Sequence, residues 1–516
     1  MAPGTLKRGL VGLHKWLGAA LSLFFAMWFA SGMVMYFVPF PALTEHERLQ
    51  ALPLLQTGGN CCLDVAEAAR RADMQAHQSR LGMLGDRQVW RVLATPSGAP
   101  AEPALWRALD ARTGAVLPPL SPAQAALLAE TFSGRAATAV EALDRDQWTV
   151  PQGLDAYRPL FKVSLGAGPE GDDGLQLYVS SRSAEVVRDT RRAERFWNWL
   201  GAVPHWIYPT VLRQFPSRWH QVVVWLSVLG VVAVGTGLAL GIWQLFLNRS
   251  RWIPYRKFWM RWHHMLGLGA GAFALTWMFS GLLSMNPFGV FTPRVPGLDE
   301  RHRWQGMDSP FRTSVADAIA AARQQGLHAV ELEPLRVGGQ SWYRLRDATR
   351  QWLVRADVPS GVEASNRLPD RLMESTLSGL RLQPPDQLVQ LNAYDELYYA
   401  RRPAAANPWQ RPLPVWRATW ADGETVYADP GSGRILMRAD QRSRWQRVLY
   451  NGLHSFDFAP LLARPRLRDA FVLGLSALGL TMSVTACVLA WRVLVGSRRM
   501  HPRQRASRAH RETEHA

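Results

Sequence analysis

Cysteine is scarce in this chain, which contains three cysteines in 516 residues. Cys61 and Cys62 are adjacent and Cys487 lies in a long apolar stretch, so there is no C-x-x-C pair and no cysteine-rich metal site. Adjacent cysteines close a strained bridge at best, so this pair can also bond to another protein or stay as free thiols. No G-x-G-x-x-G motif opens a helix after a strand, which argues against a built-in nicotinamide or flavin domain.

Charged residues are absent from four long stretches of the sequence. These stretches are residues 16–38, 219–247, 265–291 and 470–491. Each can cross a hydrocarbon core of about 30 Å, which takes about 20 helical residues, and backbone groups in lipid must bond within their own segment. A buried helix of a soluble protein explains one such stretch but not four. The first stretch is too long for the apolar region of a signal peptide and no small-x-small cleavage site follows it, so we expect a retained membrane helix.

Lysine and arginine gather on one side of the predicted membrane helices. They are Lys7, Arg8, Lys15, Arg249, Arg251, Arg256, Lys257, Arg261, Arg492, Arg498, Arg499, Arg503, Arg505, Arg508 and Arg511. The positive-inside rule then places both termini and the link between the second and third helices in the cytoplasm. Because topology explains part of the net charge of +18, we expect no nucleic-acid partner.

The predicted organisation alternates membrane helices with two large outer segments. The parts are the cytoplasmic N-terminus with helix 1 (1–39), outer domain 1 (40–215), helix 2 (216–247), a basic cytoplasmic loop (248–263), helix 3 (264–291), outer domain 2 (292–466), helix 4 (467–496) and a basic cytoplasmic tail (497–516). In the outer segments, DVAEAARRADMQA from Asp64 and SVADAIAAARQQG from Ser314 are predicted helices. Paired strands are predicted at RQVWRVLA, ALWRALDARTGAVL, LQLYVSSRSAEVVRD, SWYRLRDATRQWLVRADVPSGVEA and TVYADPGSGRIL. The fold class is therefore membrane α-helical plus α+β.

One stretch of the chain occurs twice. HKWLGAALSLFFAMWFASGM starts at His14 and HHMLGLGAGAFALTWMFSGL starts at His263, an offset of 249 residues. The same offset relates Leu17 to Leu266, Gly18 to Gly267, Trp28 to Trp277, Ser31 to Ser280, Gly32 to Gly281, Tyr178 to Tyr427, His205 to His454 and Thr236 to Thr485. We therefore predict two parallel repeats, each made of helix, outer domain and helix, around a pseudo-two-fold axis along the membrane normal.

Histidine at the ends of the predicted helices is the main candidate for chemistry. The repeat pairs His14 with His263 at the cytoplasmic level and His205 with His454 at the outer level. A b-type haem needs a neutral imidazole on each side of its iron, so these pairs predict two haems b per chain. The alternatives are histidines that snorkel at the interface, and a zinc site, for which two ligands per level are too few.

Other residues near the paired histidines have two possible roles each. His220 and His264 have no symmetric partner but are substitutes if the pairing is wrong. The small residues Gly18, Ala19, Gly267, Gly269 and Gly271 leave room for a macrocycle or serve close helix packing. The cations Arg8, Lys15, Arg213, Arg218 and Arg261 suit haem propionates or act as interfacial anchors.

The motifs HKWLG with FASG, HHMLG with MFSG, and the strand endings DARTGAVL and ADPGSGRIL resemble the PepSY-associated transmembrane family. This family includes iron-regulated inner-membrane proteins and ferric-siderophore reductases. The resemblance implies a bacterial inner-membrane location, a periplasmic PepSY-like domain in each repeat, and haem ligation by His14, His263 and His454. The stretch VPHWIYP around His205 departs from the His-Thr-Gly pattern frequent at that position.

The resemblance and the residues together predict an electron conduit that reduces a ferric siderophore or another ferric chelate. Electrons would come from quinol or a cytoplasmic donor, and the Arg- and Trp-rich outer domains suit anionic, ring-bearing ligands. One alternative is a non-enzymatic PepSY membrane protein that binds peptides or proteins. A carrier of metal or siderophore is a poorer alternative, because the predicted membrane helices contain few charges.

Overall fold

The computed structural model describes residues 3–56, 61–99, 101–247, 253–292, 294–358, 364–401 and 409–512. The chain forms two compact units. Unit 1 comprises residues 1–40, 196–291 and 445–516, and unit 2 comprises residues 41–195 and 292–444. Part of the predicted basic loop (248–252), part of a Pro- and Arg-rich segment (402–408) and the end of the tail (513–516) lie outside the described residues.

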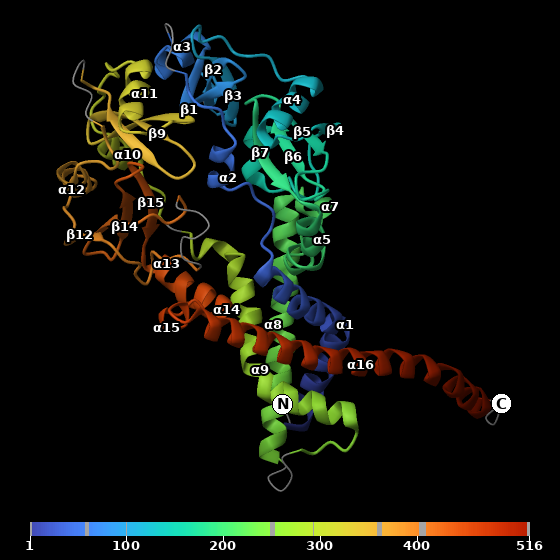
Figure 1. Ribbon diagram of the computed structural model, residues 1–516. Coiled ribbons are helices and arrows are strands. Elements are labelled where there is room, and N and C mark those ends of the chain that lie inside the picture. Colours follow the sequence, from blue (N-terminus) through green and yellow to red (C-terminus); the bar gives the residue numbers. More distant parts are fainter. Residues whose placement is uncertain are drawn as a thin grey trace. The chain divides into compact units, whose positions relative to one another are not determined.

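Four long helices form the bundle of unit 1 (Figure 1). They are α1 (Pro3–Phe37), α8 (Pro216–Leu247), α9 (Phe258–Ser284) and α16 (Pro465–Glu512). Helix α1 packs against α8 and α16, and α9 packs against the same two helices. At most 28% of the residues in the most apolar window of each helix are buried inside the protein. Apolar helices of this length with so much exposed surface indicate a membrane protein.

Short helices precede α8 and α16 and belong to unit 1. They are α5 (Arg192–Leu200, of which unit 1 takes residues from 196 on), α6 (Ala202–His205), α7 (Thr210–Arg213), α14 (Leu453–Ser455) and α15 (Ala459–Leu462); α13 (Gln441–Gln446) continues into a π-helical segment, Arg447–Gly452. Residues 196–215 and 445–466, which the sequence boundaries assigned to the outer domains, therefore lie in the helical unit. His205 and His454 are consequently part of the same unit as His14 and His263.

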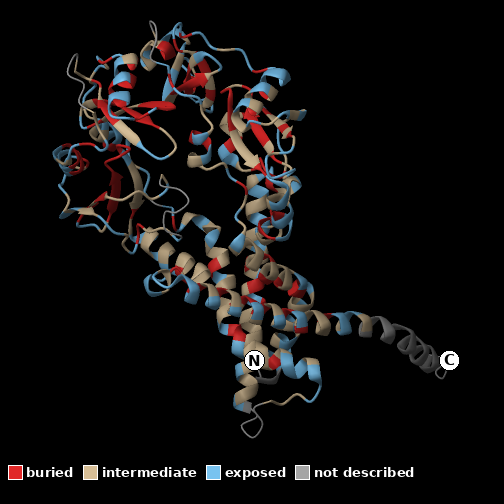
Figure 2. Ribbon diagram, viewed as in Figure 1, coloured by how far each residue is buried: buried red, intermediate tan, exposed pale blue. Residues whose placement is uncertain are grey.

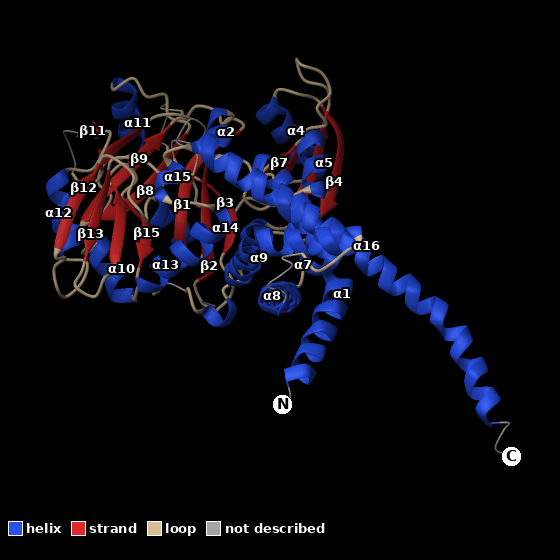
Figure 3. Ribbon diagram, turned by 90° about the horizontal axis from the view of Figure 1, so that it is seen from below, coloured by secondary structure: helices blue, strands red, loops and turns tan. Residues whose placement is uncertain are grey.

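The described strands all lie in unit 2, as Figure 3 shows by colour. They are β1 (Met74–Leu84), β2 (Arg87–Pro96), β3 (Leu105–Asp110), β4 (Ala137–Leu143), β5 (Leu160–Leu165), β6 (Gln176–Ser180), β7 (Glu185–Thr190), β8 (Glu331–Val337), β9 (Gln340–Arg346), β10 (Gln351–Arg355), β11 (Ala364–Ser365), β12 (Gln387–Leu391), β13 (Val415–Thr419), β14 (Thr425–Asp429) and β15 (Arg434–Ala439). One sheet has the order β11-β10-β9-β8-β1-β2-β3, and two four-stranded sheets have the orders β4-β5-β6-β7 and β12-β13-β14-β15.

Helices cover the sheets of unit 2 and complete its cores. They are α2 (Glu45–Gln50), α3 (Val65–Arg71), α4 (Pro122–Ser133), α10 (Leu298–Gln305), α11 (Val315–Gln324) and α12 (Asp370–Ser378). Ala318 and Ile319 of α11 pack with Leu81, Trp90 and Leu332 of the seven-stranded sheet. The buried residues of unit 2 concentrate in these strands (Figure 2).

The seven-stranded sheet contains strands from both outer segments. Strand β1 pairs antiparallel with β8, where Leu81 is opposite Leu332. The two segments predicted as separate domains therefore share a sheet and form one compact unit. Strands β6 and β14 have bounds 249 residues apart, and so do β7 and β15. The turns between them have positive φ at equivalent positions, 52° at Ala184 and 62° at Gly433.

Most of the predicted outer elements are confirmed, with one correction. The hairpins β6–β7, β9–β10 and β14–β15 and the helix α11 occur where the pattern predicted them. The predicted helix from Asp64 ends at Arg71, because Asp73 adopts a positive φ of 53° and Met74 begins strand β1. The residues DMQA are therefore not helical; a left-handed residue cannot continue an α-helix.

Candidate functional site: two facing histidine pairs

The first pair, which the sequence analysis predicted at the cytoplasmic level, joins α1 to α9. The ring centroids of His14 and His263 are 6.2 Å apart. His14 Nδ1 lies 3.0 Å from the carbonyl oxygen of Ala233 on α8, and His263 Nδ1 lies 3.0 Å from Thr485 Oγ1 on α16. Each imidazole is thus held by the second long helix of its own half of the chain.

The outer-level pair is formed by the two short helices α6 and α14. The ring centroids of His205 and His454 are 6.4 Å apart. Ser31 Oγ lies 3.3 Å from His205 Nδ1, and Ser280 Oγ lies 3.1 Å from His454 Nδ1. The carbonyl oxygen of Trp28 is also 3.1 Å from His205 Nδ1.

The partners of the four imidazoles determine their tautomer. A carbonyl oxygen only accepts, so His14 and His205 donate from Nδ1 to Ala233 and Trp28. The hydroxyls of Ser280 and Thr485 donate to carbonyl oxygens in their own helices, so they accept from the other two histidines. All four rings then carry the proton on Nδ1 and a lone pair on Nε2, which is the form that binds a metal.

The spacing within each pair fits two imidazoles on opposite sides of one metal ion. A nitrogen lies about 1.1 Å from the centre of its ring and a metal–imidazole bond is about 2.0 Å, so trans rings have centroids about 6.2–6.3 Å apart. The two observed separations are 6.2 and 6.4 Å. Tilted and edge-on ring contacts have similar spacing, as between Phe25 and Trp28 at 6.1 Å, so the spacing permits a shared metal ion without requiring one.

Glycines give the histidines room. A Cβ on Gly237 would lie 2.4 Å from His14 Cε1, and one on Gly32 would lie 3.1 Å from His205 Cε1. At the equivalent position of the second half, Gly281 faces His454 Cε1 at 3.6 Å. Gly18 and Gly267, also equivalent, have no neighbouring atom within 4 Å of such a Cβ. A side chain at these two positions would therefore meet no neighbouring helix.

The loops that carry the outer histidines are fastened by equivalent bonds. Trp219 Nε1 donates to the Trp206 carbonyl at 3.0 Å, and 249 residues later Arg468 Nε donates to the Ser455 carbonyl at 3.1 Å. The residues that follow, Ile207 and Phe456, have positive φ values of 50° and 53°. Such a conformation is costly for a β-branched or bulky residue, and it persists where the surrounding structure imposes it.

The substitute histidines lie elsewhere. His220 Nε2 is 2.9 Å from the carbonyl oxygen of Met285, and His264 is buried against the ring of Tyr255, with centroids 5.3 Å apart. Among the predicted propionate cations, Arg213 is buried with its guanidinium 4.7 Å from the Trp219 ring. Arg218 and Lys15 lie over Phe215 and Trp16.

Sequence reasoning missed the groups that orient the imidazoles. The signal available in the sequence was that Ser31, Ser280 and Thr485 each have an equivalent residue 249 positions away. A repeat alone does not give the direction in which a hydroxyl points. Asp457 was also missed: it is fully buried and accepts from Arg468 Nη2 at 2.9 Å, which ties the His454 loop to α16.

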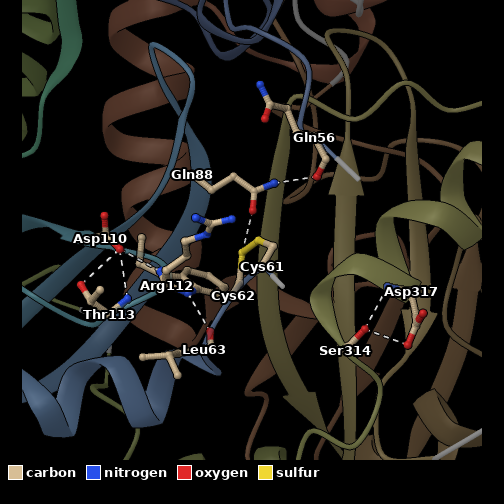
Figure 4. Close-up of a disulfide and its surroundings, with 11 residues drawn as sticks. Gln56, Cys61, Cys62, Leu63, Gln88, Asp110, Arg112, Thr113, Ser314 and Asp317 are labelled. Carbon is tan, nitrogen blue, oxygen red and sulfur yellow. Dashed lines mark hydrogen bonds between the residues drawn. A yellow bond between two sulfur atoms is a disulfide. The ribbon is translucent and has the colours of Figure 1, made fainter. Parts of the chain in front are cut away.

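The two adjacent cysteines lie in unit 2 and form a disulfide (Figure 4). Gln88 Oε1 lies 2.6 Å from Cys62 Sγ, and Gln88 Nε2 donates to the Gln56 carbonyl at 2.7 Å. The nearby turn is held by Asp110, whose carboxylate accepts from the backbone N–H groups of Arg112 and Thr113. Of the three options left open by the sequence, the structure therefore shows the bridge.

The described residues contain no group of three or more histidine, cysteine, aspartate or glutamate side chains that could hold a metal ion. A tetrahedral zinc site with protein ligands is therefore not formed by the described residues, whereas a porphyrin needs only the two axial imidazoles.

No protein-family model and no curated protein matches the chain.

Proposed function

We propose that this membrane protein holds two haems b between its four long helices and conducts electrons to an acceptor outside the membrane. The observation that carries the proposal is the pair of facing imidazole couples with centroids 6.2 and 6.4 Å apart. His14 and His263 would hold one haem through Nε2, and His205 and His454 would hold the other. Haem iron, when bound, supplies one-electron chemistry.

Two parallel repeats would place these haems at two depths. Support for the repeats comes from bonds that recur at the same offset: Ser31 to His205 and Ser280 to His454 both span 174 residues. A single haem cannot bridge a hydrocarbon core of about 30 Å, whereas two at different depths can relay an electron. The chain's own residues hold each imidazole in the Nδ1–H tautomer, and Gly32 and Gly237 make room for the rings of His205 and His14.

We further propose that quinol or a cytoplasmic donor supplies the electrons and that a ferric siderophore or another ferric chelate receives them in the periplasm. One quinol releases two electrons and two protons, and two ferric ions are reduced to ferrous ions. Ferrous ion binds hard oxygen ligands less tightly than ferric ion, so reduction favours release of the metal. The resemblance to the PepSY-associated transmembrane family and its inner-membrane reductases supports this direction.

A visible spectrum of the full-length protein, purified after haem-replete expression, tests the proposal. We expect a b-type Soret band and two haems per chain by pyridine haemochrome assay. His14→Ala and His263→Ala should each remove one haem, and His205→Ala and His454→Ala should each remove the other. His220→Ala is the control and should retain both haems, because His220 contacts the Met285 carbonyl instead of another histidine.

Absence of a Soret band in the wild-type protein would refute the haem proposal. The four histidines would then be packing residues, and the non-enzymatic alternative, a PepSY membrane protein that binds peptides or proteins, would remain. Loss of both haems in every histidine variant, with no difference between levels, would refute the assignment of two separate sites.

A further inference from the structure

Unit 2 contains a cavity that the haem proposal does not use. Its volume is about 690 Å³, which lies within the range of small-molecule sites. It lies beside the pairing of β1 with β8, because β1, β3, β9, β10 and the β14–β15 turn all contribute to its wall. All of its lining residues belong to unit 2.

The charged side chains of the cavity wall leave an excess of positive charge. Five arginines and three carboxylates line it: Arg80, Arg344, Arg346, Arg350, Arg434, Glu45, Glu333 and Asp429. Two further pairs of opposite charge, Arg48 with Glu331 and Arg91 with Glu185, lie behind the wall and are buried. Asp347 pairs with Arg350 at 3.1 Å, so the balance is one positive charge in a partly enclosed site, where low-dielectric walls strengthen the field.

The carboxylates of the wall already accept hydrogen bonds. Glu333 accepts from Arg344, Arg346 and Arg434 at 3.1 to 3.2 Å. Burial alone would raise the pKa of Glu333, but the charges of Arg346, Arg434 and Arg344 lower it to about 2. Asp429 accepts from the backbone N–H groups of Gly431 and Ser432. Glu333 therefore remains ionised, and the oxygens of both acids are engaged by the protein.

Aromatic rings hold several of the guanidinium groups in place. Arg80 lies 4.3 Å from the ring centre of Trp106, and Arg344 lies 5.4 Å from that of Trp409. Stacked guanidinium groups lose less entropy when their N–H groups bind a planar oxyanion. Arg350 and Arg434 are more accessible, since their side chains are 57% and 54% exposed, and they pair with Asp347 and Glu333 at 3.1 Å.

A buried hydroxyl gives an independent sign of a ligand. Ser432 lines the cavity and is 4% exposed, yet among the described residues its Oγ has no hydrogen-bond partner. A buried polar group without a partner costs about 1–3 kcal/mol, and native proteins rarely leave one in that state. A ligand oxygen in the cavity would satisfy it.

We propose that this cavity binds a small organic polycarboxylate, with carboxylate groups on Arg350 and Arg434 and a hydrogen bond from Ser432. The wall arginines already engage the carboxylates of Glu333 and Glu45, which shows that their spacing suits this group. The volume exceeds what a single inorganic anion fills. The proposal goes beyond the haem function and does not depend on it.

The test is calorimetric titration of citrate into the full-length protein in nanodiscs. We expect saturable binding with a Kd below about 1 mM, weakened by added salt. Arg350→Gln and Arg434→Gln should each weaken binding about tenfold, because each removes a charge-assisted hydrogen bond. Glu333 keeps Arg344 and Arg346 in the second variant, so the fold should survive, as a thermal melt would verify.

Two controls separate a site from a general effect of charge. Arg192→Gln removes the same charge from an exposed ion pair with Asp172, outside the cavity wall, and should leave the Kd unchanged. Ser432→Ala should weaken citrate binding several-fold without lowering the melting temperature, because the wild-type hydroxyl has no protein partner to lose. Pyrophosphate should bind more weakly than citrate.

Three results would overturn the proposal. They are the absence of citrate binding, an equal loss of affinity in the Arg192 control, and tighter binding of pyrophosphate than of citrate. Wild-type protein from haem-replete expression that lacks a Soret band but binds citrate would support the cavity proposal while refuting the haem proposal, so the two failures are distinguishable.

Discussion

A histidine offers one nitrogen to a metal, and the hydrogen bond at its other nitrogen decides which one. In this protein all four paired imidazoles have a partner at Nδ1. Such partners fix the ring orientation and raise the basicity of the free nitrogen. The residues that matter most for the proposed cofactor therefore include hydroxyls that never touch it.

Removing one of these hydroxyls should loosen one haem. We expect Ser280→Ala to weaken haem retention at the pair of His205 and His454 about 10- to 100-fold, because it removes the hydroxyl 3.1 Å from His454 Nδ1. Haem transfer to apomyoglobin measures the loss. Ser284→Ala is the matched control, since the Ser284 hydroxyl donates to the Gly281 carbonyl and contacts no histidine. Equal transfer rates in both variants would show that Ser280 does not position the ligand.

Asp189 in unit 2 should make the stability of the protein depend on pH. Burial, then the charges of Glu47 and Glu194, raises the pKa of Asp189 to about 6 although Arg191 opposes the shift. The stability from the protonated form is complete below the unfolded pKa of about 3.9 and is lost as the pH rises through 6. Asp189→Asn should therefore stabilise the protein at pH 7.5 by about 1–2 kcal/mol, after discounting for partial exposure.

Hydrogen exchange of β7 in the full-length protein measures this effect. The gain in protection should disappear at pH 4, where aspartate in the folded wild type is already protonated. Asp308→Asn, at a side chain that is 90% exposed, is the control. A gain that is the same at both pH values would argue that Asp189 acts through packing and not through its charge.

For single residues, the sequence predicted the histidines but not their hydrogen-bond partners. The repeat of 249 residues paired His14 with His263 and His205 with His454, and the structure brings those rings together with centroids 6.2 and 6.4 Å apart. The hydroxyl partners depend on how far each helix is rotated about its axis, which a charge-free apolar stretch does not reveal. Only the repeat favoured His205 over His220, which has no symmetric partner.

Helices and strands could be predicted from the sequence wherever the pattern that indicates them is local. The four charge-free stretches predicted the four long helices, although α9 begins at Phe258, before the apolar stretch. Arg261 is tolerated there because a long cation at a helix end reaches the membrane interface. The hairpins were predictable from alternating residues and glycine turns. The end of α3 was not, since Asp73 breaks a pattern that remains amphipathic beyond it.

The turn between β14 and β15 offers a test at the level of an element. Gly433 has a φ of 62°, and an added Cβ would lie 2.9 Å from Leu335 Cδ1 and 3.0 Å from Val337 Cγ2. Gly433→Ala should destabilise unit 2 by about 2–3 kcal/mol through backbone strain and overpacking together. Hydrogen exchange of β14 and β15 in the full-length protein measures it.

Gly423→Ala isolates the contribution of the backbone. Gly423 has a φ of 80°, but a Cβ there would meet no atom within 4 Å. The cost should be about 1 kcal/mol. If both variants lost the same stability, the contacts with Leu335 and Val337 would have no energetic weight.

The whole molecule has a predicted orientation in the membrane. The basic residues on one side of the helices place the C-terminus in the cytoplasm. Green fluorescent protein fused to the C-terminus should therefore fluoresce, and alkaline phosphatase at the same point should be inactive. Phosphatase inserted in the exposed turn at Gly85–Asp86 should be active. The opposite pattern would invert the topology and the direction of electron flow with it.

The arrangement of unit 2 is the part of the fold that the sequence did not predict. The periodicity of each outer segment indicated helix and strands, but the pairing of β1 with β8 joins residues about 250 positions apart through one register pair, Leu81 with Leu332. Local patterns carry no information about such a pairing. The cavity beside it was equally hidden, because its arginines come from strands distant in sequence.

The bond between β1 and β8 also constrains how the polypeptide can be divided. Expressed alone, residues 1–256 would leave β1 with an open row of backbone donors and acceptors, which invites association with another chain. The strand best matched to that edge is its counterpart in a second molecule, meeting it head to head. We therefore expect this half of the chain to dimerise, so that the edge of β1 gains the partner strand that β8 provides in the full-length protein.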